Sequence, residues 1–374
     1  MRATLPLARV VIIGPRLDAR GGIAMVNATY AAAGLFEDAN QTPLITYFPS
    51  TRDASYPKKC AYAALRLAIF AFTPLPRPSL VHLHTTSHSS FWRKAAYACV
   101  ARAKGARVIH HIHASSFIEF YERGGRLRRA AVRATLGRAD ALIALTEGMA
   151  RCLQILAPDK RIDVLPNPVQ LNSLRVNPVP ARKLNLVLFL GWFVPEKGIF
   201  DLVDAVALAI RDVPDIQLAL GGFRNELAVR ARARARGIED RIELRGWLDR
   251  NAVAQALHEC TVLVLPSQTE GFGLVLVEAM ACGTPIITCP VGGIPEVVQS
   301  PRNAIFVSPG DVSGLSAALV DILTKPHLRQ SMAKTGPADA RRFDVSYIIP
   351  RLRAIYDRVL ASAHAHRRHM SSRS

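Results

Sequence analysis

The sequence lacks the apolar segments and cysteine patterns that would place the protein in a membrane or an oxidising compartment. No stretch of its 374 residues reaches about 18 apolar residues without a charge, which argues against a transmembrane helix. The apolar run from Val10 to Ile13 is short and leads into a glycine turn, so we expect no signal peptide. None of the six cysteines forms a CxxC pair, and no histidine cluster accompanies Cys282 and Cys289. Zinc and disulfide frameworks are therefore not predicted, and a reducing cytoplasm is expected.

Acidic residues are scarce as well: 29 Asp and Glu stand against 48 Lys and Arg, a formal net charge of +19. Residues 1–182 hold 25 basic and 10 acidic residues, whereas residues 183–374 hold 23 and 19. A basic first half favours an anionic partner, such as nucleic acid, a membrane surface or a phosphate-bearing substrate. A general preference for arginine in the genome is the alternative, although it does not explain the asymmetry. The basic residues are not interleaved with aromatic ones as in nucleic-acid modules, so nucleic acid is not the predicted partner.

Short apolar runs alternate with amphipathic stretches along most of the chain, which indicates βαβ units and parallel sheets. Four prolines between Pro166 and Pro180 interrupt this alternation and predict a linker. We therefore predict an α/β protein of two Rossmann-like, doubly wound domains that face a central cleft, because such sheets bind ligands beyond the carboxyl ends of their strands. The predicted domains cover residues 1–180 and 181–342, followed by a helix over 343–362 that packs back on the first domain, and by a disordered tail over 363–374.

The most informative segment runs from Pro266 to Pro285, where a buried strand is followed by a glycine-rich turn and a helix. Gly271 and Gly273 let the backbone approach a ligand closely, and the free N–H groups of the new helix suit a diphosphate. Glu270 precedes this helix and Glu278 lies two turns further along. Two carboxylates so placed can accept hydrogen bonds from hydroxyls at the two ends of a sugar nucleotide. The alternative is an acidic residue at a helix start together with a solvated glutamate.

Two further turns each follow a predicted strand and precede a predicted helix. Lys197, with Gly198 after it, would present a positive charge to a phosphate. Gly21 and Gly22 form a loop that a phosphate can approach, although a pair of glycines is a weak signal by itself. The pattern GxGxxG is absent, which argues against a dinucleotide-dependent oxidoreductase.

Two predicted strands end in histidines. Alternation along a strand places His82 and His84 on one face, and His111 and His113 on one face, with His113 nearest the carboxyl end. A metal site is disfavoured because no acidic partner lies at short spacing. For each histidine, a structural role in the core is the alternative to a role in the site.

The segment from Pro266 to Pro285 is similar to the motif of two glutamates separated by seven residues in retaining GT-B glycosyltransferases of family 4 (group 1). The first half resembles bacterial exopolysaccharide and lipopolysaccharide members. The resemblance implies that Glu270 contacts the hydroxyls of a donor hexose and that Glu278 binds the ribose. It also implies that Lys197 holds the diphosphate and that His113 touches the sugar near its reacting centre. His113, Glu270 and Lys197 are thus the predicted catalytic residues, and the predicted donor-binding residues are Gly21, Gly22, Gly271, Phe272, Gly273, Leu274 and Glu278.

The sequence departs from this family at Trp192, where the signature that contains Lys197 has an arginine on the diphosphate. We hypothesise that Arg16 or Arg20 compensates. Alternatively, Trp192 packs in the core.

The resemblance implies transfer of a hexose from a GDP- or UDP-hexose, with retention and without a cofactor. No DxD motif is present, so no metal site is predicted. The basic first half, with Arg126, Arg128, Arg129 and Arg133 on one predicted helix, suits a polyprenyl-diphosphate-linked saccharide at the inner face of the plasma membrane. We expect a cytoplasmic protein that is peripheral on that membrane. A GT-B nucleotide-sugar epimerase and a non-catalytic basic binding protein are the alternatives.

Overall fold

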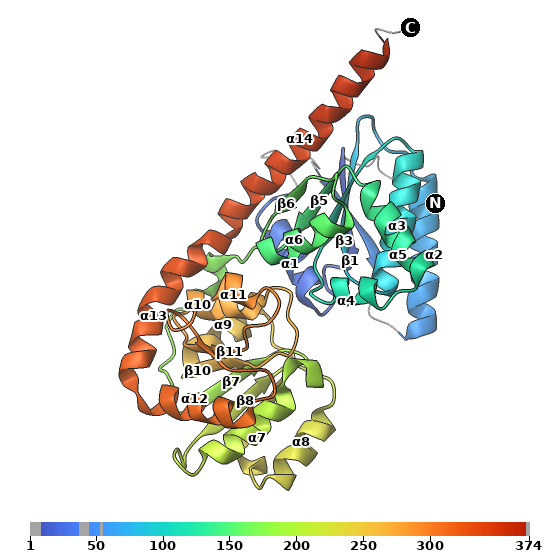
Figure 1. Cartoon of the computed structure of the whole chain (residues 1–374). Coiled ribbons are helices and arrows are strands. Elements are labelled where there is room, and N and C mark those ends of the chain that lie inside the picture. The colour runs from blue at the N-terminus through green and yellow to red at the C-terminus, as the bar shows by residue number, and fades with distance from the viewer. Residues whose placement is uncertain (1–8, 37–44, 53–54, 372–374) are drawn as a thin grey trace. The chain divides into compact units, whose positions relative to one another are not determined.

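The computed structural model describes residues 9–36, 45–52 and 55–371, and the chain divides into two compact units (Figure 1). Unit 1 comprises the chain up to Pro168 together with the segment from Val345, and unit 2 comprises Val169–Asp344. Each unit holds one six-stranded sheet whose paired strands are all parallel. The prediction of two Rossmann-like α/β domains is confirmed.

The boundary between the units falls at Val169, earlier than the predicted boundary at residue 181. The reason is that the proline-rich segment is attached to unit 2. Gln170 Oε1 accepts a hydrogen bond from Arg250 (2.8 Å), and the carbonyl of Leu174 lies 3.0 Å from His258 Nε2. Prolines end the strands and helices here, but side-chain contacts decide to which unit the segment belongs.

The sheet of unit 1 has the strand order β2-β1-β3-β4-β5-β6, so the connections change direction between β1 and β3. Its central strands β1 and β3 are buried along almost their whole length because helices cover both faces of the sheet. In Figure 1, α2, α3 and α5 lie on one side of this sheet, and α1 and α14 lie on the other. The strands are β1 (Val10–Pro15), β2 (Ile45–Thr51), β3 (Leu80–Thr85), β4 (Arg107–Ile112), β5 (Ala141–Ala144) and β6 (Ile162–Val164). The helices are α1 (Gly22–Ala32), α2 (Tyr56–Phe72), α3 (Ser89–Ala103), α4 (Phe117–Glu122), α5 (Arg126–Gly137), α6 (Glu147–Leu156) and α14 (Val345–Ser371).

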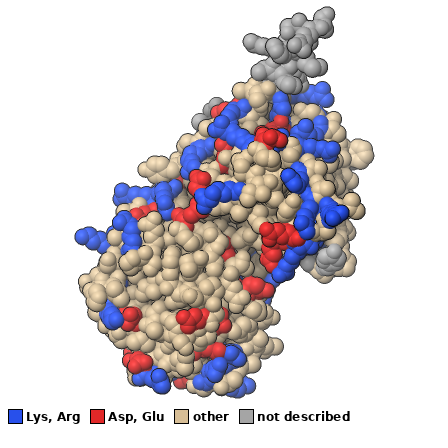
Figure 2. Space-filling view, viewed as in Figure 1, with Lys and Arg blue, Asp and Glu red and all other residues tan. Residues whose placement is uncertain are grey.

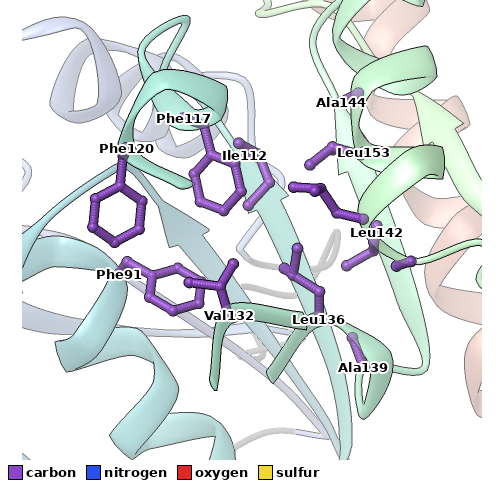
Figure 3. Close-up of a cluster of buried hydrophobic side chains, with 12 residues drawn as sticks. Phe91, Ile112, Phe117, Phe120, Val132, Leu136, Ala139, Leu142, Ala144 and Leu153 are labelled. Carbon is purple, nitrogen blue, oxygen red and sulfur yellow. The ribbon is translucent and has the colours of Figure 1, made fainter. Parts of the chain in front are cut away.

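A hydrophobic cluster holds the segment that follows β4 (Figure 3). Phe117 and Phe120 of α4 pack on Phe91 of α3, with ring centroids 5.7 Å apart in both cases. Val132 and Leu136 of α5 belong to the same cluster. Each such side chain stabilises the fold by about 1.5–3 kcal/mol when fully buried. The cluster therefore fixes the chain directly after the carboxyl end of β4, where His113 lies.

The long C-terminal helix α14 belongs to unit 1 and packs against α1, β3 and β4. Arg351 donates a hydrogen bond to the carbonyl of Val164 (2.7 Å), and Arg358 forms an ion pair with Asp163. The helix continues to Ser371, whereas the sequence-based prediction ended it at residue 362 and assigned 363–374 to a disordered tail. The stretch 363–371 lacks glycine and proline and contains alanine, arginine and methionine, which favour helix. Residues 372–374 lie outside the described part of the chain.

The sheet of unit 2 has the order β12-β11-β10-β7-β8-β9, with the change of direction between β7 and β10. The strands are β7 (Leu186–Leu190), β8 (Gln217–Gly221), β9 (Ile242–Gly246), β10 (Val262–Leu265), β11 (Ile286–Thr288) and β12 (Ile305–Phe306). The α-helices are α7 (Ile199–Ala209), α8 (Glu226–Ala235), α9 (Arg250–Glu259), α10 (Leu274–Ala281), α11 (Ile294–Val297), α12 (Val312–Thr324) and α13 (Pro326–Ala340). Short 3-10 helices are η1 (Leu171–Leu174), η2 (Pro195–Lys197), η3 (Glu239–Arg241) and η4 (Arg341–Phe343).

Surface charge differs between the two units. Figure 2 shows Lys and Arg side chains gathered over unit 1, whereas the face of unit 2 in the same view carries few charges. The basic side chains over unit 1 agree with the excess of basic over acidic residues in the first half of the sequence. Within the described residues, no helix has the length and apolarity to span a bilayer.

Candidate active site

The predicted donor-binding residues of unit 2 gather where β10 ends and α10 begins. Gly273 is the N-cap of α10 with φ +77°, a left-handed conformation that favours glycine. Leu274 is the first residue of the helix, and Phe272 is buried against Phe343, with ring centroids 5.4 Å apart. The first amides of α10 have no partner within the helix and form the positive end of its dipole. This turn is therefore suited to an anion.

Glu270 and Lys197 form an ion pair beside this turn, with Oε2 2.6 Å from Nζ. The other carboxylate oxygen of Glu270 accepts a hydrogen bond from the amide of Gly271 (3.1 Å). Both side chains keep part of their surface in solvent, 28% for Lys197 and 16% for Glu270. A phosphate can therefore reach the ammonium group, and a sugar hydroxyl can reach the carboxylate.

Backbone geometry brings Lys197 to this position. Gly198 follows η2 with φ +68°, and a Cβ at Gly198 would lie 2.1 Å from the carbonyl oxygen of Pro266. The amide of Gln268 also donates to the carbonyl of Glu196 (2.9 Å). The start of α7 and the β10–α10 loop are thus in direct backbone contact, and only glycine allows that approach.

Glu278 lies in α10, where it is half-buried. Burial raises the pKa of its carboxyl group to about 7, and the nearby charge of Arg250 on α9 opposes this rise. Hydrogen bonds from ligand hydroxyls stabilise the ionised form of a carboxylate. Glu278 is thus a half-buried acceptor, and its ionised form becomes more favourable once a hydroxyl-bearing ligand binds.

In unit 1, four histidines form a two-by-two array on one face of the sheet. In the pairing of β3 with β4, His84 lies opposite His111 and His82 lies opposite Ile109, while His113 follows the end of β4, so the two pairs are offset by two residues. His84 Nδ1 and His113 Nε2 share a hydrogen bond of 2.7 Å. Burial lowers the pKa of His82 and of His113 to about 3, and it lowers the pKa values of His84 and His111 well below the ordinary value. All four imidazoles are therefore neutral at physiological pH.

Two residues that the sequence analysis did not single out complete this region. Tyr356 of α14 places its hydroxyl 2.6 Å from His82 Nδ1, so that α14 covers the imidazole array. On the opposite face, His110 lies 3.1 Å from Thr85 Oγ1, and the buried Lys94 donates to Ser50 (2.5 Å). Lys94 could have been noticed because it follows Phe91 by three residues on the apolar face of its helix. Tyr356 gave no local signal.

His82, His84 and His111 each offer a ring nitrogen that could bind a metal, and these nitrogens lie within 4.8 Å of one another. However, His82 Nε2 and His111 Nδ1 lie 3.3 Å apart, with ring planes inclined by only 18°. These two nitrogens face each other in a hydrogen bond and do not point at a common centre. We therefore interpret this trio as a hydrogen-bonded part of the core.

The glycine loop of unit 1 opens α1 at the carboxyl end of β1. Gly21 is its N-cap with φ 138°, and Gly22 is its first residue. Arg16, one of the two arginines expected to compensate for Trp192, forms two hydrogen bonds with Asp18, of 2.8 and 2.6 Å. Its guanidinium group is thus already paired. Gly21, Gly22 and His113 belong to unit 1, and the other predicted site residues belong to unit 2.

Three aromatic side chains form a row in unit 2. Trp192, Phe223 and Trp247 follow the carboxyl ends of β7, β8 and β9. Ring centroids are 6.2 Å apart for Trp192 and Phe223, and 5.5 Å apart for Phe223 and Trp247. Trp192 is therefore a member of a partly exposed row at the ligand-binding edge of the sheet.

Two parallel six-stranded sheets with interleaved helices are typical of the GT-B class of fold, and comparison with known proteins agrees. Residues 8–168 match the family described as glycosyl transferase 4-like domain, and residues 173–339 match glycosyl transferases group 1. HepE of Anabaena, whose structure was solved in complex with UDP and glucose, superposes with a TM-score of 0.73 and 18% identity over 94% of this chain and 99% of that chain. The fold is GT-B.

Curated relatives identify the family. The 2-deoxystreptamine N-acetyl-D-glucosaminyltransferase of Streptomyces fradiae is 32% identical over 289 residues, which cover 70% of this chain and 67% of that protein. The phosphatidyl-myo-inositol mannosyltransferase of Mycobacterium leprae is 32% identical over 219 residues, 57% of this chain. That match spans 58% of the mannosyltransferase, little more than half of its length. The chain belongs to the group 1 glycosyltransferases, family 4.

Proposed function

We propose that the protein transfers a hexose from a nucleoside-diphosphate sugar to a saccharide acceptor, with retention of anomeric configuration. The observation that carries this proposal is the pair of Lys197 and Glu270 at the first turn of α10. This arrangement offers a cation and helix amides to a diphosphate, and a carboxylate to the hydroxyls of the attached sugar. Glu278 would accept hydrogen bonds from the ribose further along the same helix.

In the proposed reaction, the bond between the anomeric carbon and the diphosphate oxygen breaks, and a bond to the acceptor oxygen forms on the same face of the sugar. The acceptor proton passes to the departing phosphate, so that no protein nucleophile is needed. Lys197 and the amides at the start of α10 stabilise the negative charge on the leaving diphosphate. Glu270 and His113 hold the hexose, and Glu270 also stabilises the positive charge that develops on it. This scheme requires neither a metal nor a cofactor.

The donor is a GDP- or UDP-hexose. The solved HepE complex contains UDP and glucose, and one relative is named a mannosyltransferase. Within this chain, the partly exposed rings of Phe223 and Trp247 offer a stacking surface to either nucleobase.

The acceptor would be a polyprenyl-diphosphate-linked saccharide at the inner face of the plasma membrane, in the synthesis of a cell-surface polysaccharide. Helix α5 supports this proposal, because Arg126, Arg129 and Arg133 are exposed beside Leu127, which is 89% exposed. Arg128 is directed instead over the ring of Phe120, 5.2 Å from its centroid. Exposed arginines around a leucine suit an anionic bilayer surface, where each basic residue contributes about 1 kcal/mol. The protein would thus be cytoplasmic and peripheral on that membrane.

A donor screen tests this function. The purified chain is given UDP- and GDP-hexoses in EDTA, with and without a polyprenyl-diphosphate-linked saccharide. We expect one nucleoside diphosphate to be released only when the acceptor is present, and we expect Glu270→Ala to abolish release. Asp321→Ala is the matched control, because Asp321 forms an exposed ion pair with Lys325 on α12 (2.6 Å).

Two results would overturn the proposal. Conversion of the donor to an isomeric nucleotide sugar without acceptor would instead identify an epimerase. Binding of no nucleotide sugar at all would leave a basic binding protein.

A further inference from the structure

The aromatic row at the ends of β7 and β8 carries a cation that the sequence analysis did not predict. The guanidinium carbon of Arg224 lies 3.7 Å from the centroid of the Trp192 ring, well within the distance of a cation–π contact. Trp192 stands where the family resemblance implies an arginine. A positive charge is therefore present at this position, but it comes from the neighbouring strand.

Backbone contacts hold Arg224 in place. The amide of Phe193 donates to the carbonyl of Phe223 (3.0 Å), and Asn225 Nδ2 donates to the carbonyl of Phe193 (2.9 Å). Gly222 allows this approach, since a Cβ there would lie 1.8 Å from the carbonyl oxygen of Gly191. Arg224 itself has φ +79°, a conformation that is costly for a residue with a side chain. The backbone of the loop after β8 is thus strained at Arg224, the residue that carries the positive charge.

The charges of the neighbouring residues show why this cation is available to a ligand. Lys197 is paired with Glu270, and Arg232 and Arg236 are both paired with Asp204. The guanidinium group of Arg224 forms no ion pair within the described residues and is exposed. A diphosphate carries more negative charge than the single, partly neutralised Lys197 can balance. A guanidinium group binds phosphate oxygens in a bidentate manner.

We infer that Arg224 binds the diphosphate of the donor as the second cation of the site and that Trp192 is the surface on which its guanidinium group rests. This inference rests on the proposed function, because it assigns a partner for the diphosphate. It differs from the expectation that Arg16 or Arg20 supplies the missing charge. Arg224 and Lys197 lie on the β8–α8 and β7–α7 loops, which the Phe193–Phe223 and Asn225–Phe193 hydrogen bonds connect.

Calorimetric titration of the full chain with UDP and UMP, and with GDP and GMP, tests this inference. Arg224→Gln keeps a long side chain and the same backbone strain but removes the charge. We expect it to weaken binding of the preferred nucleoside diphosphate about 10- to 100-fold, the effect of one charged hydrogen-bonding partner. We expect a smaller loss for the monophosphate. Arg230→Ala, at an exposed position of α8, is the matched control and should bind as the wild type does.

A second variant separates loss of charge from collapse of the loop. Trp192→Arg combined with Arg224→Gln places the cation on the β7 side and should restore most of the affinity for the diphosphate. Equal losses for diphosphate and monophosphate, or unchanged affinity in Arg224→Gln, would overturn the inference while leaving the proposed function intact. A wild-type chain that binds neither UDP nor GDP would overturn both.

Discussion

The buried histidines of unit 1 make the stability of that unit sensitive to mild acid. His82, His110 and His113 are buried, and burial lowers their pKa values to about 3, 4 and 3. In the unfolded chain these groups titrate near pH 6.5. A lowered pKa in the folded state means that the stabilisation is present above pH 6.5 and is lost as the pH falls toward 3. Each histidine then costs roughly 1.4 kcal/mol per pH unit below 6.5.

Between pH 7.5 and pH 5.5, these three residues together should lower the free energy of unfolding of unit 1 by roughly 4 kcal/mol. His84 and His111 shift in the same direction and add to the loss. Since domains are commonly stable by only about 5–15 kcal/mol, unit 1 should be close to unfolding near pH 5.

Tryptophan fluorescence in urea measures this effect, because Trp92 is the one tryptophan of unit 1. The double variant Trp192→Phe/Trp247→Phe keeps only Trp92 and therefore reports on unit 1. The variant Trp92→Phe keeps the two tryptophans of unit 2 and reports on that unit, in which no described histidine is buried. The urea midpoint should fall steeply with acid for the first variant and little for the second. If the urea midpoint reported by Trp92 is the same at pH 7.5 and pH 5.5, the conclusion that the imidazoles are buried in their neutral form is refuted.

Three further predictions concern single side chains. Gly198→Ala should lower the free energy of unfolding of unit 2, measured in urea, by about 1–3 kcal/mol and weaken donor binding. Gly237→Ala is the control, because Gly237 has a similar φ of +71° but open space around it. An equal loss of stability in both variants would show that the clash with the Pro266 carbonyl is not the cause. Glu278→Gln should be more stable than the wild type by about 1–3 kcal/mol at pH 8 but not at pH 4, because the raised pKa of Glu278 costs stability as the pH rises through about 7. A stability difference between the two proteins that is the same at both pH values would contradict this. Lys94→Met should raise the melting temperature at pH 7, because burial lowers the pKa of Lys94 and makes its charged form costly in the folded state. The gain in melting temperature should shrink toward pH 10. A gain that does not change with pH would contradict this cause.

Strands β1, β7 and β10 were predictable because parallel strands covered on both faces often contain continuous apolar runs. The apolar run from Val10 to Ile13, for example, lies in β1, and the apolar segment 262–265 forms β10. Strand β2, Ile45–Thr51, was missed, because polar residues and Pro49 interrupt its apolar pattern. An edge strand tolerates such residues, since one of its sides has no sheet partner.

The predicted site residues of unit 2 share local signals, namely glycines and charges at strand-to-helix turns. The contacts that surround them are non-local and left no such signal. Tyr356 reaches His82 across 274 positions of sequence, and Arg224 reaches Trp192 from the next strand. The departure at Trp192 could be read from the sequence, but its compensation depends on which loop lies beside it in the folded sheet.

Proton NMR of hexose transfer in EDTA, comparing the wild type with Lys197→Ala, tests the proposed retaining transfer most directly. We predict an acceptor-dependent product that keeps the anomeric configuration of the donor, with one nucleoside diphosphate released per sugar. Lys197→Ala should lower kcat/KM about 100-fold, the usual effect of removing one group that stabilises transition-state charge. An inverted product, or no transfer from any UDP- or GDP-hexose by the wild type, would contradict the account.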